Sequence, residues 1–144
     1  MNTTDLRALT VHQPWAAAIV HGGKDVENRT RRTHHRGLIL IHSGQTYDFD
    51  AGHHELDTWI RSGRAPRDWA FGAIIGAAEI TGCHPADGTC CPSWGETEPG
   101  VWHWTLAGQC ALTEPVGARG MLGFWRPSAE VLEKVAAQLE AGAR

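Results

Sequence analysis

The chain has 144 residues, of which 42% are hydrophobic and 20% charged, and its formal net charge at pH 7 is −3. This composition is typical of one globular domain, and the chain is long enough to bury a core without disulfides or metal ions. No stretch approaches 18 consecutive apolar residues, and residues 1–15 lack the basic and apolar segments of a secretory signal. We therefore expect one cytoplasmic domain over residues 1–144, with no membrane partner.

The N-terminal part of the chain predicts a strand followed by a helix. Residues 8–12 alternate and are rich in strand-forming residue types, and Pro14 suits the first turn of a helix. Gly22 and Gly23 are expected to end that helix, because glycine readily adopts the left-handed conformation found at helix C-termini. The helix then presents Lys24 at a sharp exit.

Two further segments predict the centre of a sheet and a second helix. Residues 37–44, GLILIHSG, form a continuous apolar run typical of a strand buried on both faces, and residues 25–29 have room for a short strand before it. A short amphipathic helix is expected next, capped by Asp48 or Asp50 and ended by Gly63.

The segment FGAIIGAAEITGC, residues 71–83, predicts a second central strand. Strict alternation places Glu79 on a face that otherwise carries Ala73, Ile75 and Ala77. A carboxylate on an apolar face has two explanations, which the sequence leaves open. Glu79 either pairs with an arginine at the mouth of the fold or transfers a proton in a reaction.

The rest of the chain predicts more strands and a final helix. Three strands are expected, at residues 101–106, 109–116 and 120–125, after a loop rich in Pro, Gly, Asp and Ser at 84–100. Ser128 is expected to cap an amphipathic helix. Five to seven strands with two or three flanking helices around one core predict an α+β fold, built as a small mixed barrel.

Several segments resemble the ASCH (activating signal cointegrator homology) family: LTVHQPWAAAIVHGGKDVENRT, RGLILIHSG, GAIIGAAEITGC, VWHWTL and EPVGARGMLGFWRP. The most specific part is the family's G-x-K-x-x-E-x-R signature, matched here by Gly22, Lys24, Glu27 and Arg29. The resemblance implies a PUA-like β-barrel that binds single-stranded RNA or a modified nucleoside in a cleft.

The resemblance also implies catalysis in some members of the family. One group resembles amidohydrolases that remove the acetyl group from acetylated cytidine, and another resembles ribonucleases. The amidohydrolase site consists of a lysine, a threonine three places later and a glutamate on a later strand. Lys24 and Glu79 match two of these positions, whereas Glu27 stands in place of the threonine.

A hydrolase built on these residues would work without the threonine nucleophile. Glu27 would activate a water molecule, Lys24 would stabilise the oxyanion, and Glu79 would donate a proton to the leaving group. This mechanism requires no cofactor, although a ribonuclease could use a divalent metal ion held by carboxylates. The competing interpretation is an internal ion pair, of Lys24 with Glu27 or of Glu27 with Arg29.

Basic and aromatic residues supply candidate ligand contacts. The run from residue 29 to residue 36 carries four positive charges and no negative charge, and it predicts phosphate contacts or, alternatively, a solvated loop. Among seven tryptophans, Trp59 and Trp104 are expected in the core, whereas Trp15 could stack on a base together with Trp102 or Trp125. The predicted ligand-binding residues are Gln13, Trp15, Arg29, Arg31, Arg32, Arg36 and Trp102.

The four cysteines, Cys83, Cys90, Cys91 and Cys110, are expected to be thiols, as is usual in a reducing cytosol. Cys83 and His84, followed by Cys90 and Cys91 and then Cys110 or His103, offer nitrogen and sulfur ligands for zinc. The spacing is not a standard one, and adjacent cysteines rarely both reach one ion, so we do not expect a structural zinc.

Two classes of function stay open. The first is a protein that binds RNA or a modified nucleoside and hydrolyses it with Lys24, Glu27 and Glu79 in a basic cleft. The alternative is a non-catalytic module that binds RNA or recruits another protein. The sequence leaves the choice of RNA or nucleoside, and the oligomeric state, open.

Overall fold

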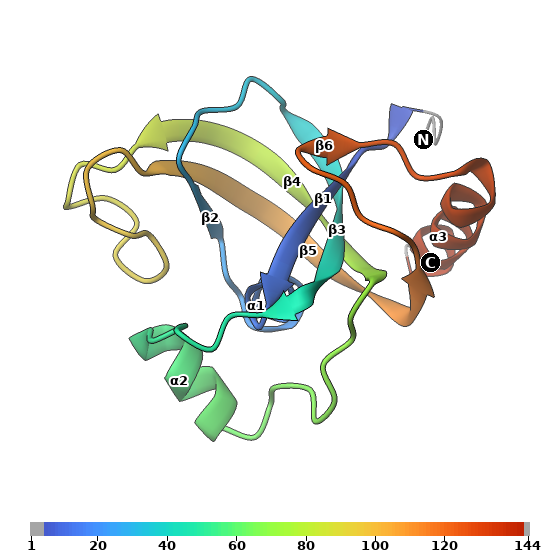
Figure 1. Ribbon diagram of the computed structural model, residues 1–144, viewed down its shortest axis with the longest axis horizontal. Helices are drawn as coiled ribbons and strands as arrows, with labels where there is room; N and C mark the ends of the chain where they lie inside the picture. The colour runs from blue at the N-terminus through green and yellow to red at the C-terminus, as the bar shows by residue number, and fades with distance from the viewer. Residues whose placement is uncertain (1–4, 143–144) are drawn as a thin grey trace.

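The structure, a computed structural model, describes residues 5–142, which form a curled mixed sheet with three helices (Figure 1). The predicted α+β class, with five to seven strands and two or three helices, is confirmed. In chain order the elements are β1 (Ala8–Gln13), α1 (Trp15–His21), β2 (Val26–Arg29), β3 (Gly37–Tyr47), α2 (His54–Arg61), β4 (Ala73–Pro85), β5 (Trp102–Gly117), β6 (Phe124–Trp125) and α3 (Ala129–Gly142).

The six strands lie in the order β2-β5-β4-β3-β1-β6. Strands β1 and β3 are parallel, and every other neighbouring pair is antiparallel. Within residues 5–142 the sheet is not closed by backbone pairing, but one side chain spans its open side. Arg29 of β2 donates from Nη2 to the carbonyl oxygen of Thr10 in β1 at 3.1 Å. The result is a barrel-like fold.

Three apolar clusters hold the elements together. The first fills the inside of the curl and includes α1, the second lies between the sheet and α3, and the third joins α1 to α2. Strand β3 contributes to both faces, since Ile39 and Ile41 belong to the first cluster and Leu40 to the second. The prediction that residues 37–44 form a strand buried on both faces is confirmed.

Strand β4 departs from the predicted alternation. Its register against β5 shifts at three places, one of them between Ile74 and Gly76, where its register against β3 also shifts and leaves Ile75 as the extra residue. Ala78 and Ile80 therefore join the cluster inside the curl, whereas Ala77 joins the outer cluster. A bulge of this kind reverses which face a side chain occupies. Glu79 lies exposed on the outer face as a result.

Helix α1 is fixed at both ends, and its C-terminal end is the one that the sequence predicts. The side chain of Gln13 accepts a hydrogen bond from the Ala17 backbone N–H at 2.9 Å. At the other end Gly23 has a φ of 74°, which lets the Lys24 N–H reach back to the Ala18 carbonyl oxygen at 3.0 Å. This turn fixes the direction in which the chain leaves the helix and the place of Lys24.

Helix α2 begins later than predicted. Its cap is His53, whose Nδ1 accepts a hydrogen bond from the Glu55 backbone N–H at 3.2 Å, so the prediction of Asp48 or Asp50 as the cap is wrong. Asp48 instead accepts a hydrogen bond from Trp15 Nε1 at 3.0 Å. The ring nitrogen of His53 thus accepts the hydrogen bond that the carboxylate oxygen of an aspartate, a more common residue at this position, would accept.

Three predicted features of the C-terminal part have mixed outcomes. Residues 109–116 continue the strand that begins at Trp102, and only the last two residues of 120–125 are in a strand. Ser128 caps α3 as predicted, accepting from the Val131 N–H at 3.3 Å.

In the described part of the chain, the helices are all too short or too polar to span a membrane.

Candidate functional site

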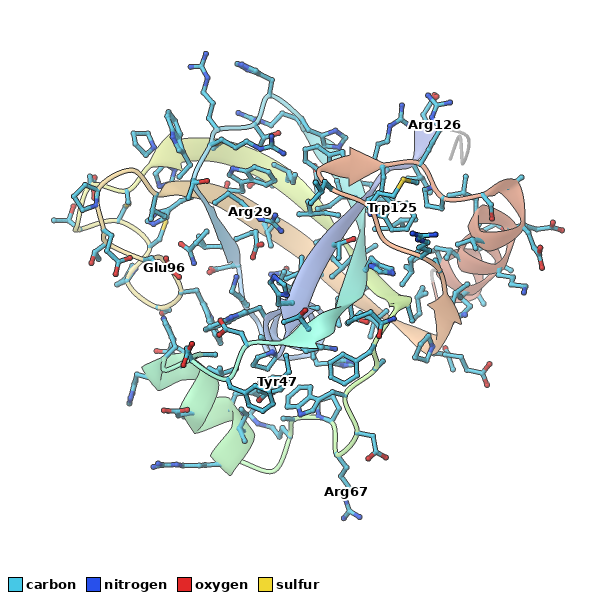
Figure 2. All side chains as sticks on the ribbon, viewed as in Figure 1. Arg29, Tyr47, Arg67, Glu96, Trp125 and Arg126 are labelled. Atoms are coloured by element: carbon cyan, nitrogen blue, oxygen red, sulfur yellow. The ribbon has the colours of Figure 1, made fainter. Side chains whose placement is uncertain are left out.

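A cavity of about 940 Å³ lies between β1, β2, β3, the connection from β4 to β5 and the connection from β5 to β6. Its size lies in the range of sites for small organic ligands. Arg29 of β2 and Glu96 of the β4–β5 connection, both labelled in Figure 2, contribute to its lining. The cavity brings together residues that lie far apart in the sequence, from Thr10 to Gly123.

Lys24, Glu27 and Arg29 form a buried ion-pair network on one wall of the cavity. Lys24 Nζ donates to Glu27 Oε1 at 2.9 Å and to the Val26 carbonyl oxygen at 2.6 Å. Arg29 Nε donates to Glu27 Oε2 at 2.8 Å. The side chains of Lys24 and Glu27 are 3% and 8% exposed, and that of Arg29 is 29% exposed. Each carboxylate oxygen of Glu27 therefore accepts a hydrogen bond from a cation.

The network keeps Glu27 ionised. Burial acts to raise the pKa of Glu27, but the charges and hydrogen bonds of Lys24 and Arg29 together lower it below its usual value. A general base needs a pKa close to the working pH. The geometry places Glu27 in both of the ion pairs that the sequence offered as the competing interpretation.

An aromatic wall, formed by Trp15, His53 and Trp94, faces the same cavity. Lys24 Nζ lies 5.5 Å from the centroid of the Trp15 ring, whose edge contacts His53 with centroids 6.0 Å apart. His53 stacks on Trp94, with centroids 5.3 Å apart and an interplanar angle of 2°. Burial lowers the pKa of His53, which favours the neutral ring. Such a wall suits the flat face of a base.

His42 supports the other side of the cavity. Its Nε2 donates to the Ala118 carbonyl oxygen at 2.7 Å, and its Nδ1 is 3.1 Å from Thr10 Oγ1. Burial lowers the pKa of His42, consistent with a neutral ring that accepts at Nδ1. Ala118 and Gly120 therefore lie close to β1 and β3. A Cβ at Gly120 would lie 2.7 Å from Thr10 Oγ1, so this close approach requires glycine.

Three of the predicted site residues outside the arginine run do not line the cavity. Glu79 is exposed on the outer face of β4, so the structure does not bring it to Lys24 and Glu27. The amide of Gln13 is buried and donates to the Ala70 carbonyl oxygen at 2.9 Å, a structural role. Trp102 is half-buried and packs against the cluster inside the curl. The strand positions of Glu79 and Trp102 were predicted, but not the directions of their side chains, and Gln13 was predicted to follow the strand that it ends.

The arginine run divides between the cavity and the surface. Arg29 lines the cavity, whereas Arg31, Arg32 and Arg36 are exposed. Arg36 is turned back on its own segment, because its Nη1 donates to the carbonyl oxygens of Thr33 and His35 at 3.1 and 2.9 Å. Arg31 lies beside the cavity, since its Nη2 is 3.4 Å from the point that a Cβ at Gly123 would occupy.

Sequence reasoning missed several residues of the site. Trp94 and Glu96 are held in place by Asn28 of β2, which donates to the Trp94 carbonyl oxygen at 3.0 Å and accepts from the Glu96 N–H at 2.9 Å. Arg119 lines the cavity from the β5–β6 connection. A tryptophan isolated in a segment of loop composition, and an arginine close to several glycines, were signals that could have found them.

Solved structures of an ASCH protein from Zymomonas mobilis have the same fold. One superposes with a TM-score of 0.57 at 14% sequence identity, covering 94% of this chain and 96% of that one. A variant of the same protein gives a TM-score of 0.54 at 14% identity, covering 95% and 98%. Identities this low establish the fold alone.

Curated relatives and a family sequence model complete the comparison. Activating signal cointegrator 1 of Homo sapiens is 34% identical over 80 residues, and that of Mus musculus is 32% identical. The matched region is 52% of this chain and only 14% of each relative. The model of the ASCH domain matches residues 9–110, which is more than half of the chain. The resemblance seen in the sequence is confirmed, and the protein belongs to the ASCH domain family.

Proposed function

We propose that this ASCH domain binds single-stranded RNA or a modified nucleoside, with one base inserted in the cavity. The observation that carries the proposal is the aromatic wall of Trp15, His53 and Trp94 along a cavity of about 940 Å³. Stacking on aromatic rings stabilises an unpaired base by about 1–3 kcal/mol. The amide of Gln45 and the backbone of residues 118–123 supply hydrogen-bonding groups for the base edge.

Charge supports placing the base, and not the phosphates, inside the cavity. Three basic side chains line it, Lys24, Arg29 and Arg119, but so do three acidic ones, Glu27, Asp48 and Glu96. A balanced lining does not favour a phosphate group. Arg31, Arg32 and Arg119 are exposed, and we expect their side chains to contact the flanking phosphates.

Recognition without chemistry is the function that the geometry supports best. Hydrolysis by the three predicted residues requires that they converge on one reacting atom. In this structure Glu79 is on the outer face of the sheet, and both oxygens of Glu27 accept hydrogen bonds from Lys24 and Arg29. The proposal therefore gives Lys24 and Glu27 a role in shaping the cavity.

Binding of labelled RNA tests the proposal. The protein is titrated into a single-stranded RNA of about twelve nucleotides and into a duplex of the same sequence, and fluorescence anisotropy is recorded at several salt concentrations. We expect the single strand to bind more tightly, because a duplex does not release a base to the cavity, and we expect the affinity to fall as salt rises. The RNA is recovered afterwards to detect cleavage.

A matched pair of charge reversals locates the binding surface. Arg119→Glu changes the rim of the cavity, whereas Arg67→Glu makes the same change on a side chain that Figure 2 shows pointing outward from the connection between α2 and β4. Arg119→Glu should weaken binding about fivefold or more, equivalent to about 1 kcal/mol, with little effect of Arg67→Glu. Equal effects of the two charge reversals on RNA affinity would contradict the proposal. Absence of any RNA binding would also contradict it and would favour a domain that recruits another protein. Cleaved RNA would restore the hydrolase interpretation.

A further inference from the structure

Four nitrogen and sulfur ligands converge at the end of the β4–β5 hairpin, outside the cavity. We call His84, Cys90, Cys91 and His103 the Cys/His cluster. His84 and His103 are directly opposite each other on β4 and β5, and the two cysteines come from the connection between these strands. One ligand atom from each residue lies within 4.8 Å of all the others.

The distances within the Cys/His cluster fit a tetrahedral metal ion. Cys90 Sγ lies 3.3 Å from His103 Nδ1, and Cys91 Sγ lies 3.5 Å from His84 Nε2. Sulfur and nitrogen ligands on one tetrahedral zinc ion, at ordinary bond lengths, are about 3.6 Å apart. Small side-chain rotations would bring the longest separation, at most 4.8 Å, to that range.

The backbone explains how two adjacent cysteines reach one point. Cys91 has a φ of 54°, which is rare for a residue other than glycine, and this left-handed conformation changes the direction of its side chain relative to that of Cys90. The turn before it is fixed by Asp87, whose Oδ1 accepts hydrogen bonds from the N–H groups of Thr89 and Cys90 at 2.8 and 2.7 Å. The expectation of no zinc rested on the non-standard spacing and on the adjacency of the cysteines, and this turn could not be predicted from the sequence.

The hydrogen bonding of His103 leaves the correct nitrogen free for a metal. His103 is 1% exposed, and its Nε2 is 2.7 Å from the Glu96 carbonyl oxygen. A carbonyl oxygen only accepts, so Nε2 carries the proton and the lone pair of Nδ1 points toward Cys90. Metal-binding histidines are commonly oriented in this way by a backbone carbonyl.

We propose that the Cys/His cluster binds one structural Zn²⁺ through His84 Nε2, Cys90 Sγ, Cys91 Sγ and His103 Nδ1. Two sulfur and two nitrogen ligands in tetrahedral geometry fit zinc, and four protein ligands leave no position for a substrate. The ion would fix the connection between β4 and β5, which carries Trp94 and Glu96 to the cavity wall. The zinc site thus lies behind the cavity and supports it.

The test uses the full chain, purified under reducing conditions without a metal-affinity column. Metal content is measured, zinc is removed with a chelator, and the metal-free protein is titrated with Co²⁺, which reports tetrahedral thiolate coordination by its visible absorption. We expect one zinc ion per chain, one equivalent of tetrahedral Co²⁺, and slower hydrogen exchange in residues 86–101 once metal is bound. Cys90→Ser should abolish the cobalt absorption, and Cys110→Ser, which alters an exposed cysteine outside the cluster, should retain it.

Several results would overturn the proposal. The first is that the wild-type protein holds no stoichiometric zinc and gives no tetrahedral cobalt spectrum. The second is a Cys90–Cys91 disulfide that persists in reductant, and the third is loss of the cobalt spectrum in Cys110→Ser. If Cys90→Ser does not fold, the cobalt titration of the wild-type protein decides alone.

Discussion

Residues 24–29 and residues 31–36 are neighbouring segments rich in basic side chains, and their surroundings differ. In the first segment, Lys24 and Arg29 lie on either side of Glu27 at the cavity wall, with short hydrogen bonds. In the second, three arginines are exposed, and Arg36 bonds only to carbonyl oxygens of its own segment in the contacts described. Residues 26–29 of the first segment form strand β2, whose pairing with β5 fixes their side chains, and Lys24 is placed by the turn that ends α1. The second segment follows the end of β2.

The contrast shows that local charge density does not determine whether a basic side chain is buried in an ion pair or exposed. A basic residue in a paired strand has a fixed direction and can be desolvated by its neighbours. A basic residue in a connection stays solvated and contributes to the field around the protein. We therefore expect residues 24–29 to determine stability and cavity shape, and the exposed Arg31 and Arg32 to determine the salt dependence of binding.

The largest expected effect is that of Glu27→Ala on stability. The change leaves Lys24, which is 2% exposed, without its counterion, and breaking a buried ion pair in this way costs about 3–5 kcal/mol. Urea unfolding measures the loss. The control is Glu130→Ala in α3, where the pair with Lys134 is exposed and should contribute less than about 0.5 kcal/mol. Similar losses of unfolding free energy in the two variants would show that the buried network stabilises the fold no more than an exposed ion pair does.

Part of that stabilisation should depend on pH. Because the folded-state pKa of Glu27 is below its usual value of 4.5, its contribution is fully present above about that pH and is lost as the pH falls through the folded-state pKa. Urea midpoints of the wild-type protein and of Glu27→Gln, measured from pH 6 to pH 3, should converge toward the acid end. A constant difference between them would contradict the ionised network.

The next effect concerns stacking. Trp15→Leu removes a ring that lines the cavity and should weaken binding of single-stranded RNA by about 1–3 kcal/mol. Trp102→Leu removes a ring of the same type that packs inside the sheet and does not line the cavity. Anisotropy titrations on folded samples of both variants compare them. A larger loss of affinity in Trp102→Leu would place the RNA elsewhere.

A smaller effect separates the arginines within the exposed run. For single strands, each phosphate that the protein no longer neutralises reduces the slope of log affinity against log salt by about 0.7, so replacing Arg31 and Arg32 together by alanine should reduce it by about 1.4. Arg36→Ala should leave the slope nearly unchanged, because its guanidinium is held by carbonyl oxygens. If Arg36→Ala reduces the salt slope as much as the double variant does, the predicted difference between these arginines is wrong.

The smallest effect is expected for Glu79→Gln. Its side chain is exposed on the outer face of β4, so stability and RNA affinity should each change by less than about 0.5 kcal/mol. Unfolding and binding measurements on the same sample test this. A large loss of affinity, or of any hydrolytic activity, would mean that Glu79 reaches the ligand after all.

Much of the fold could be predicted, because it depends on patterns that are local in sequence. The apolar run of β3, the glycines that end α1 and the Ser128 cap all specify local backbone geometry. The place of Glu79 could not be predicted, because bulges between β4 and β5 reverse the alternation.

The site shows the same division. Lys24, Glu27 and Arg29 were found because they lie close together in one segment. Trp94, His53 and Arg119 come from connections whose positions depend on tertiary packing, and the Cys/His cluster depends on the left-handed conformation of Cys91. No spacing rule encodes these contacts.

The most direct test of the central claim follows the indole N–H resonances of the tryptophans by NMR while single-stranded RNA is added. Seven tryptophans give a reporter in several parts of the fold, and substitutions assign each resonance. We expect the resonances of Trp15 and Trp94 to shift first and most, with those of Trp59 and Trp102 little changed. Shifts confined to Trp59 or Trp102, or no shifts at RNA concentrations that saturate binding, would show that the cavity is not where RNA binds.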